Sequence, residues 1–252
     1  MFSRKKKSRN NYFFSKLQLI VKRLKSEKKK GVEILNLALL SLMIILSGYF
    51  IGGLHGSYIA QWISGVNVKD QGVKNSGASN ATIVLGWKFG ALVALFDIGK
   101  GFLAVLLLAY ILDTQSLING YTNTLLLLIG AAVVIGHNYP FWMNFDGGKG
   151  TASIIGIMFA VDWRMGCIGL TLLILITVIT DYLPIGVLFL YLTLLVYVFW
   201  FMGGFWPNFI SLALFTLAIW KHRENILRIK QGTEPKVSTV MKKKKTTSPQ
   251  EF

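Results

Sequence analysis

The sequence predicts an all-α, polytopic membrane protein with about seven transmembrane helices, some of them short or re-entrant. Of its 252 residues, 53% are hydrophobic, and the mean hydropathy of +0.54 is high for a soluble domain. The apolar runs also recur at lengths close to the ~17–25 residues that span a hydrocarbon core. Composition and spacing therefore favour a chain that crosses the bilayer repeatedly.

Seven apolar segments follow one another along the chain. They cover residues 34–63, 89–112, 122–139, 151–161, 165–180, 183–202 and 206–220. The fourth and seventh are short for a crossing, so we expect them to borrow flanking residues, to thin the bilayer locally or to enter it without crossing. Pro140, Pro184 and Pro207 mark expected helix boundaries, because the residue before a proline avoids helical geometry.

The charge pattern divides the chain into three parts. Residues 1–31 form a basic arm, residues 32–222 the transmembrane part, and residues 223–252 a basic cytoplasmic tail. Much of the formal net charge of +16 lies at the two ends, where basic clusters attract anionic lipid headgroups by about 1 kcal/mol per residue. Nucleic acid is the competing partner. On a membrane protein, however, basic flanks are more often lipid and orientation signals, so we expect anionic membrane lipids and no nucleic acid.

The basic residues between the segments predict the orientation. If all seven segments cross, the connections that carry Lys69, Lys74, Lys88 and Lys149 share one face, and the positive-inside tendency makes that face cytoplasmic. The same count places the basic arm outside, against the tendency. The sequence leaves this conflict open.

The stretch over residues 136–153 carries the most specific chemical signal. Gly147, Gly148 and Gly150 surround Lys149 between two apolar segments. Such glycines let backbone N–H groups and an ammonium converge on a small anion. At the edge of a membrane helix this turn is suited to hold a phosphate. The alternative is a helix-capping turn whose lysine merely lies among the headgroups.

Two more polar stretches, residues 68–80 and 222–234, also combine glycine with amide or basic side chains. Neither they nor the dispersed histidines at positions 55, 137 and 222 have the spacing of a metal site. We therefore expect no metal and no cofactor. Cys167 is the only cysteine, so no intrachain disulfide forms, and its place in an apolar run predicts a buried, inert thiol.

The three polar stretches, in this order and separated by apolar segments, resemble motifs of the bacterial acyl-phosphate:glycerol-3-phosphate acyltransferase family. Residues 136–150 match its Gly-His-x-Phe/Tyr-Pro…Phe-x-Gly-Gly-Lys-Gly motif, and residues 222–234 match His-Arg-x-Asn-Ile-x-Arg…Gly-x-Glu. Asp97, Lys100 and Gly101 look like the family's Asp-x-x-Lys-Gly. The resemblance covers about residues 48–236.

The first stretch departs from the family's Arg-x-x-Gly-Ser-Gly-Asn-x-Gly-Ala-Thr-Asn motif. Lys69 stands in place of the arginine, Val73 of the serine and Lys74 of the second glycine, and Ile83 replaces an arginine that usually follows. Lysine keeps the charge but loses the bidentate geometry of arginine toward phosphate. These departures leave the expected fold unchanged and bear on rate and substrate preference.

The resemblance implies an enzyme that transfers a fatty acyl group from acyl phosphate to the 1-hydroxyl of glycerol 3-phosphate, forming lysophosphatidic acid. Residues 32–222 then form the acyltransferase domain. The resemblance places the protein in the bacterial cell membrane as a multi-pass protein with its active site on the cytoplasmic face. Acyl phosphate is a mixed anhydride with a good leaving group, so the protein needs only to hold two phosphates, orient a hydroxyl and stabilise an oxyanion.

The resemblance also suggests roles for individual residues. The expected catalytic residues are His137, Lys149, His222 and Asn225. The expected substrate-binding residues are Lys69, Asn75, Asn80, Gly147, Gly148, Gly150, Ser153, Arg223 and Glu234. Proton removal falls to His137, to His222 or to a substrate phosphate. Each residue also has a local alternative, such as a turn, a helix cap or a lipid anchor.

Two other functions stay open at this point. One is a transporter of small anions or lipids, although polar residues at bundle depth are few and the two halves show no matching broken spans. The other is a degenerate family member that binds lipid without catalysis. Asp97 and Lys100, three apart on one helix, can pair with each other inside the membrane. Both a structural and a catalytic role for this pair stay open.

Overall fold

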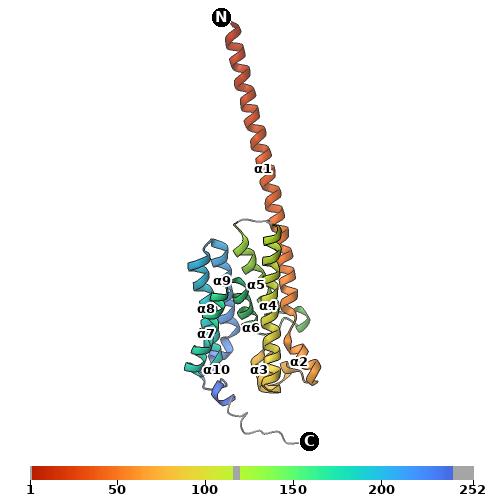
Figure 1. The fold of residues 1–252 in the computed structure, drawn as a ribbon, viewed down its shortest axis with the longest axis vertical. Coiled ribbons are helices and arrows are strands. Elements are labelled where there is room, and N and C mark those ends of the chain that lie inside the picture. Colours follow the sequence, from red (N-terminus) through yellow and green to blue (C-terminus); the bar gives the residue numbers. More distant parts are fainter. Residues whose placement is uncertain (1, 116–119, 241–252) are drawn as a thin grey trace. The chain divides into compact units, whose positions relative to one another are not determined.

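The structure is a computed structural model that describes residues 2–115 and 120–240, and its regular elements in these ranges are all helical (Figure 1). The α-helices are α1 (Phe2–Gly53), α2 (Gly56–Ser64), α3 (Ala78–Leu85), α4 (Trp87–Gln115), α5 (Thr122–Asn138), α6 (Thr151–Val161), α7 (Trp163–Thr180), α8 (Leu183–Tyr197), α9 (Phe205–Lys221) and α10 (Arg223–Lys230). Three short helical segments, η1 (Val68–Asp70), η2 (Phe141–Met143) and the π-helical η3 (Val198–Met202), join them.

The boundaries of these helices follow local chemistry. Asp162 caps α7 by accepting a 2.8 Å hydrogen bond from the backbone N–H of Arg164, the usual role of an aspartate at this position. Pro184 lies in the first turn of α8, where its missing N–H costs nothing. Gly150 precedes α6 with a φ of 76°, a left-handed conformation that glycine adopts without strain.

The chain divides into two units after Met43. The first contains the N-terminal part of α1, where Arg23 pairs with Glu27 at 3.5 Å and Lys29 with Glu33 at 3.9 Å. Exposed pairs with this spacing stabilise a helix by only about 0.3–0.5 kcal/mol. The boundary of the basic arm at residue 31 and its contact with anionic lipids both stay predictions.

In the second unit, α4 packs most extensively against α6. Glycines allow this close approach: a Cβ atom on Gly101 would overlap the Ser153 carbonyl, and one on Gly156 would overlap the Ile98 carbonyl. Helices in a membrane gain little from hydrophobic exclusion, so they associate through such small-residue contacts. The α4–α6 contact thus places the first turn of α6 beside the middle of α4.

The end of α1 packs against α5 in the same manner. A Cβ atom on Gly52 would overlap the Val133 carbonyl, and one on Gly136 would overlap the Tyr49 carbonyl. The Tyr49 hydroxyl also donates a 2.8 Å hydrogen bond to the carbonyl of Tyr139, just after α5. These contacts hold the C-terminal end of α5 in place.

The all-α, polytopic class is confirmed. Five helical stretches among the described residues are long and apolar enough to cross a membrane: Ser26–Ser64, Trp87–Asp113, Thr122–Met143, Trp163–Thr180 and Leu183–Met202. The two segments predicted to be short are α6, with 11 residues, and α9, with 17. A total of seven crossings stays a prediction.

The first apolar segment differs from its prediction as one continuous run over residues 34–63. Helix α1 ends at Gly53 and α2 begins at Gly56. The Lys100 ammonium binds the carbonyl groups of Gly52 and Leu54, and the Asp97 carboxylate accepts from the N–H of Gly56. A buried ion pair on α4 thus satisfies the backbone groups that the break exposes.

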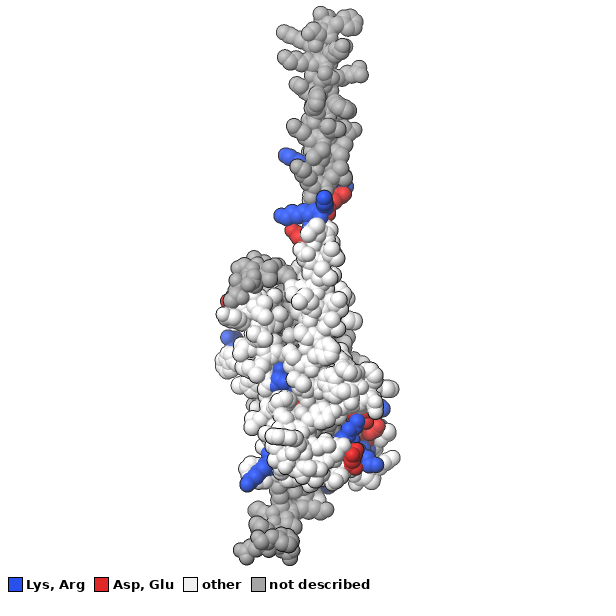
Figure 2. Space-filling view, turned by 90° about the vertical axis from the view of Figure 1, so that its right-hand side faces the viewer, with Lys and Arg blue, Asp and Glu red and all other residues white. Residues whose placement is uncertain are grey.

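The surface has the character expected in a bilayer. On the face in Figure 2, long stretches of the helices carry no Lys, Arg, Asp or Glu. Leu103, Leu107, Val178 and Ile179 are large apolar side chains that are more than half exposed. Extended apolar surface of this kind marks contact with lipid or with another protein.

We expect Gly156→Ala to destabilise the protein in detergent by at least ~2 kcal/mol, because the new methyl group would overlap the backbone of α4 and overpacking costs about 1–3 kcal/mol. Gly99→Ala is the matched control, since nothing lies within 4 Å of a Cβ atom there. Thermal unfolding of the two variants measures the difference. Equal melting temperatures would show that the α4–α6 contact is not tight.

Candidate active site

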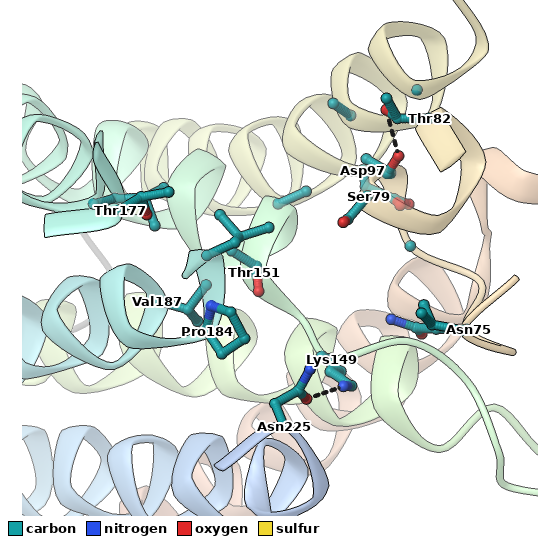
Figure 3. Close-up of a pocket in the computed structure, with 18 of the residues that line it drawn as sticks. Asn75, Ser79, Thr82, Asp97, Lys149, Thr151, Thr177, Pro184, Val187 and Asn225 are labelled. Atoms are coloured by element: carbon teal, nitrogen blue, oxygen red, sulfur yellow. Dashed lines mark hydrogen bonds between the residues drawn. The ribbon is translucent and has the colours of Figure 1, made fainter. Parts of the chain in front are cut away.

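The three polar stretches of the sequence meet at one cavity of about 560 Å³ (Figure 3). It lies among α3, α4, α6, α7, α8 and the ends of α5 and α9. Six of the predicted site residues that line it carry polar side chains: Asn75, His137, Lys149, His222, Asn225 and Glu234. Gly150, another predicted site residue, also lines the cavity. The remaining wall is largely apolar.

Lys149 precedes Gly150, the residue before α6, and Gly150, Thr151 and Ala152 line the cavity beside it. The N-terminus of a helix carries a partial positive charge and unpaired N–H groups, which favour an anion. Burial, together with the positive charge of Arg228, lowers the pKa of Lys149 to about 8. A half-buried ammonium at this helix end is suited to bind a phosphate.

A chain of hydrogen bonds fixes the Lys149 ammonium. It donates to the Asn225 side-chain oxygen, as Figure 3 shows. The Asn225 amide nitrogen donates to Glu234 at 2.6 Å, and the second oxygen of Glu234 accepts from Arg228 at 2.7 Å. Each donor and acceptor orients the next. Residues 222–234 therefore position Lys149, which belongs to the motif at residues 136–150.

Gly147 and Gly148 allow the backbone of the turn to approach His137 closely. A Cβ atom on Gly147 would overlap the His137 carbonyl, and one on Gly148 would overlap the His137 ring. Their N–H groups donate to the carbonyl groups of Asn138 and His137 at 3.1 and 3.0 Å. These two amides therefore build the turn that presents Lys149, and the backbone that lines the cavity beside it belongs to the N-terminus of α6.

His137 belongs to a buried cluster with Asp97, Lys100 and His55. The Lys100 ammonium lies 2.8 Å from His137 Nδ1 and 2.9 Å from the Asp97 carboxylate, so the predicted Asp97–Lys100 pair is present. The His55 ring stacks on His137 with 4.4 Å between the centroids. An ammonium can only donate. His137 Nδ1 therefore accepts, and the ring proton lies on Nε2.

His222 follows α9 and is 4% exposed. Burial, with the positive charges of Lys149 and Lys221 nearby, lowers its pKa to about 3. The imidazole is therefore neutral near pH 7 and can accept a proton or a hydrogen bond from a molecule in the cavity. It becomes a stronger base when a phosphate anion lies beside it.

The two asparagines of the first motif have different positions. Asn75 lines the cavity, and its side-chain oxygen is buried without a partner among the described residues. Asn80 does not line the cavity. Its amide oxygen accepts from Val73 N–H, and its amide nitrogen donates to the carbonyl groups of Val68, Gln71 and Asn75. Asn80 thus holds the loop in which Asn75 is presented.

Three other predicted residues also lie outside the cavity wall. Lys69 donates to the backbone of Asp146 and pairs with its carboxylate at 3.1 Å, linking the first and second motifs. The Arg223 guanidinium lies over the Trp220 ring, 4.5 Å from its centroid. Ser153 is fully buried between α6 and α4, and its hydroxyl has no partner within residues 2–115 and 120–240.

Several cavity residues carried no signal in the sequence. Thr82 and Thr177 contribute polar side chains, and Val237 and Val240 line the cavity from the chain after α10. They resemble ordinary turn, helix and tail residues until the fold brings them together. In the described ranges, no three His, Cys, Asp or Glu side chains are grouped in a way that could hold a metal ion.

The sequence and the fold are both similar to known proteins. The family model for glycerol-3-phosphate acyltransferase matches residues 42–232. Glycerol-3-phosphate acyltransferase 1 of Oceanobacillus iheyensis is 46% identical over 199 residues, which cover 79% of this chain and 96% of that protein. The glycerol-3-phosphate acyltransferase of Thermotoga petrophila is 36% identical over 194 residues, covering 76% and 93%.

Two solved structures of PlsY, an integral membrane glycerol 3-phosphate acyltransferase, share the fold at 28% sequence identity. Its glycerol 3-phosphate form gives a TM-score of 0.70 over 80% of this chain and 97% of PlsY. Its lysophosphatidic acid form gives 0.66 over 78% and 94%. Together with the family match and the shared motifs, these similarities show that the chain belongs to the glycerol-3-phosphate acyltransferase family.

Proposed function

We propose that this protein transfers a fatty acyl group from acyl phosphate to the 1-hydroxyl of glycerol 3-phosphate and releases lysophosphatidic acid. One observation carries the proposal: a desolvated lysine at a helix N-terminus opens into a cavity that is otherwise largely apolar. A phosphate and a fatty chain require these two environments side by side. The names of the relatives support glycerol 3-phosphate as acceptor, and the family resemblance supports acyl phosphate as donor.

In this proposal Lys149 and the α6 N-terminus hold a phosphate group. Asn225 keeps the ammonium in place through its hydrogen bond, and the unpartnered oxygen of Asn75 accepts a hydrogen bond from a glycerol hydroxyl. The carbonyl carbon of the mixed anhydride is then attacked directly, because phosphate is already a good leaving group. Holding both substrates in reactive geometry supplies much of the rate enhancement.

The proton of the attacking hydroxyl needs an acceptor. His137 is poorly suited, because Lys100 occupies its Nδ1 and its Nε2 carries the proton. His137 lines the cavity, and in this tautomer its Nε2 can serve only as a hydrogen-bond donor. Neutral His222 and the phosphate oxygens of the substrates remain as acceptors, and the proton leaves on the released phosphate.

We place this reaction in the bacterial cell membrane, with the cavity open to the cytoplasm. The positive-inside tendency supports this side, since the connections that lead to the site carry Lys69, Lys74, Lys88 and Lys149. A water-soluble substrate made in the cytoplasm then reaches the same site as a donor whose chain stays among the helices.

Purified protein should form lysophosphatidic acid from acyl phosphate and labelled glycerol 3-phosphate, and Lys149→Ala should lower kcat/KM at least ~100-fold. This loss equals roughly 2.7 kcal/mol of transition-state stabilisation, because the variant leaves a phosphate without its buried counter-charge. Product extraction measures the rate. Lys88→Ala is the control, since this lysine is exposed and does not line the cavity. Product from an acyl thioester but none from acyl phosphate would refute the proposed donor.

The pH dependence should follow Lys149. Its pKa of about 8 means that the free enzyme loses this positive charge as the pH rises through 8. Because kcat/KM reports groups of the free enzyme, its value for glycerol 3-phosphate should fall above about pH 8. In Lys149→Arg this alkaline decline should be absent, since a guanidinium stays charged. The same decline in both proteins would assign it to another group.

Transfer should proceed without an acyl-enzyme intermediate. A mixed anhydride needs no enzyme nucleophile. The burial predicted for Cys167 is wrong: it is an exposed residue of α7, but it does not line the cavity. We expect intersecting double-reciprocal plots and near-normal activity for Cys167→Ala. Parallel plots, or a labelled acyl group trapped on the protein with donor alone, would contradict direct transfer.

A further inference from the structure

The chain after α10 is attached to the site at its beginning. We call residues 234–240 the strap. Its first residue, Glu234, is 8% exposed and holds Asn225 and Arg228 by hydrogen bonds of 2.6 and 2.7 Å. The strap therefore starts at the group that positions Lys149.

The strap is attached a second time, at the connection between α7 and α8. The N–H of Val237 donates to the Asp181 carbonyl at 3.0 Å. Ser238 donates its N–H and its hydroxyl to the two carboxylate oxygens of Asp181 at 2.8 and 2.5 Å. Asp181 has a φ of 64°, a left-handed conformation that aspartate tolerates better than most residues. Three hydrogen bonds to one residue thus fix the middle of the strap.

Between and beyond these attachments, the strap forms part of the cavity wall. Pro235, Val237 and Val240 line the same cavity as Lys149 and Asn225. Figure 3 shows Thr177, Pro184 and Val187 of α7 and α8 on the side of the cavity opposite Asn75. Because Asp181 joins α7 to α8, the valines of the strap belong to this apolar side.

We propose that the strap determines the length of the acyl chain that the enzyme accepts, with Val237 and Val240 as the wall and the Asp181–Ser238 contact as the anchor that holds the wall in place. The inference rests on the proposed acyl transfer. A chain that just reaches the valines gains apolar contact with each added methylene group. A longer chain has to displace the strap, and the hydrogen bonds to Asp181 resist this displacement.

The test measures kcat/KM of the full-length protein with saturated acyl phosphates of about ten to about eighteen carbons at a fixed concentration of glycerol 3-phosphate. Ser238→Ala, which loosens the anchor, should raise the ratio of long-chain to short-chain kcat/KM at least about fourfold, the factor for the contacts of one methylene group. Val237→Trp, which fills the apolar side, should lower the ratio by a similar factor. The KM for glycerol 3-phosphate should stay unchanged in both.

Two variants of the strap serve as controls. Ser238→Thr keeps the hydroxyl and should retain the wild-type ratio. Thr239→Val changes an exposed residue of the strap that does not line the cavity, and it should leave the chain-length profile unchanged.

The outcomes separate the two proposals. Wild-type protein that acylates glycerol 3-phosphate while every variant keeps the same chain-length ratio would overturn the strap inference alone. A parallel loss for all chain lengths, with a raised KM for glycerol 3-phosphate, would overturn it as well and assign the strap to Lys149 positioning. Wild-type protein without transfer from any acyl phosphate would overturn both proposals.

Discussion

The buried ammonium of Lys100 is the constraint on which the site depends. It lies within hydrogen-bond distance of the Asp97 carboxylate, the carbonyl groups of Gly52 and Leu54, and His137 Nδ1. A charge inside a bilayer is costly unless it is paired, so the end of α1 and the end of α5 both have to meet α4 at this point. The Lys100 side chain therefore holds α1, α4 and α5 together at this point.

That constraint reaches Lys149 through His137. The His137 carbonyl accepts from Gly148 N–H, and its ring leaves no room for a side chain at Gly148. The glycine turn is therefore shaped against a histidine that Lys100 and His55 hold in place. From the other side, Glu234 and Asn225 fix the lysine side chain. Lys149, the proposed phosphate-binding residue, is thus held between the buried cluster around Lys100 and the start of the strap.

The structure shows where the residues that depart from the family motif at positions 69–80, and Ile83 after it, are located. Lys74 has a φ of 51°, a conformation that favours glycine, the residue that the family motif has there. The loop keeps its shape because Asn80 binds four backbone groups around it. Val73 and Ile83 line the cavity, so apolar side chains stand where the resemblance predicts serine and arginine. At and just before α3, the cavity wall of this chain is therefore more apolar than the family motif predicts.

Local sequence patterns predicted the fold class, several cavity residues and one buried ion pair. The apolar segments predicted the helical membrane class, because the bilayer fixes the length and hydropathy of a spanning helix. Lys149, Gly150, Asn225 and Glu234 line the cavity and were candidates from the sequence because the residues of each motif stand close together in the chain. The ion pair of Asp97 and Lys100 was found because residues three apart on a helix share a face.

Only the tertiary structure decided which of these residues face the cavity. Asn80, Lys69 and Arg223 have the same side-chain chemistry as true cavity residues, but their partners lie in the loop, in Asp146 and in Trp220. Conversely, Thr177, Val237 and Val240 enter the cavity wall without any motif. A motif records residue types along the chain, whereas the direction of a side chain depends on packing between segments that are far apart in sequence.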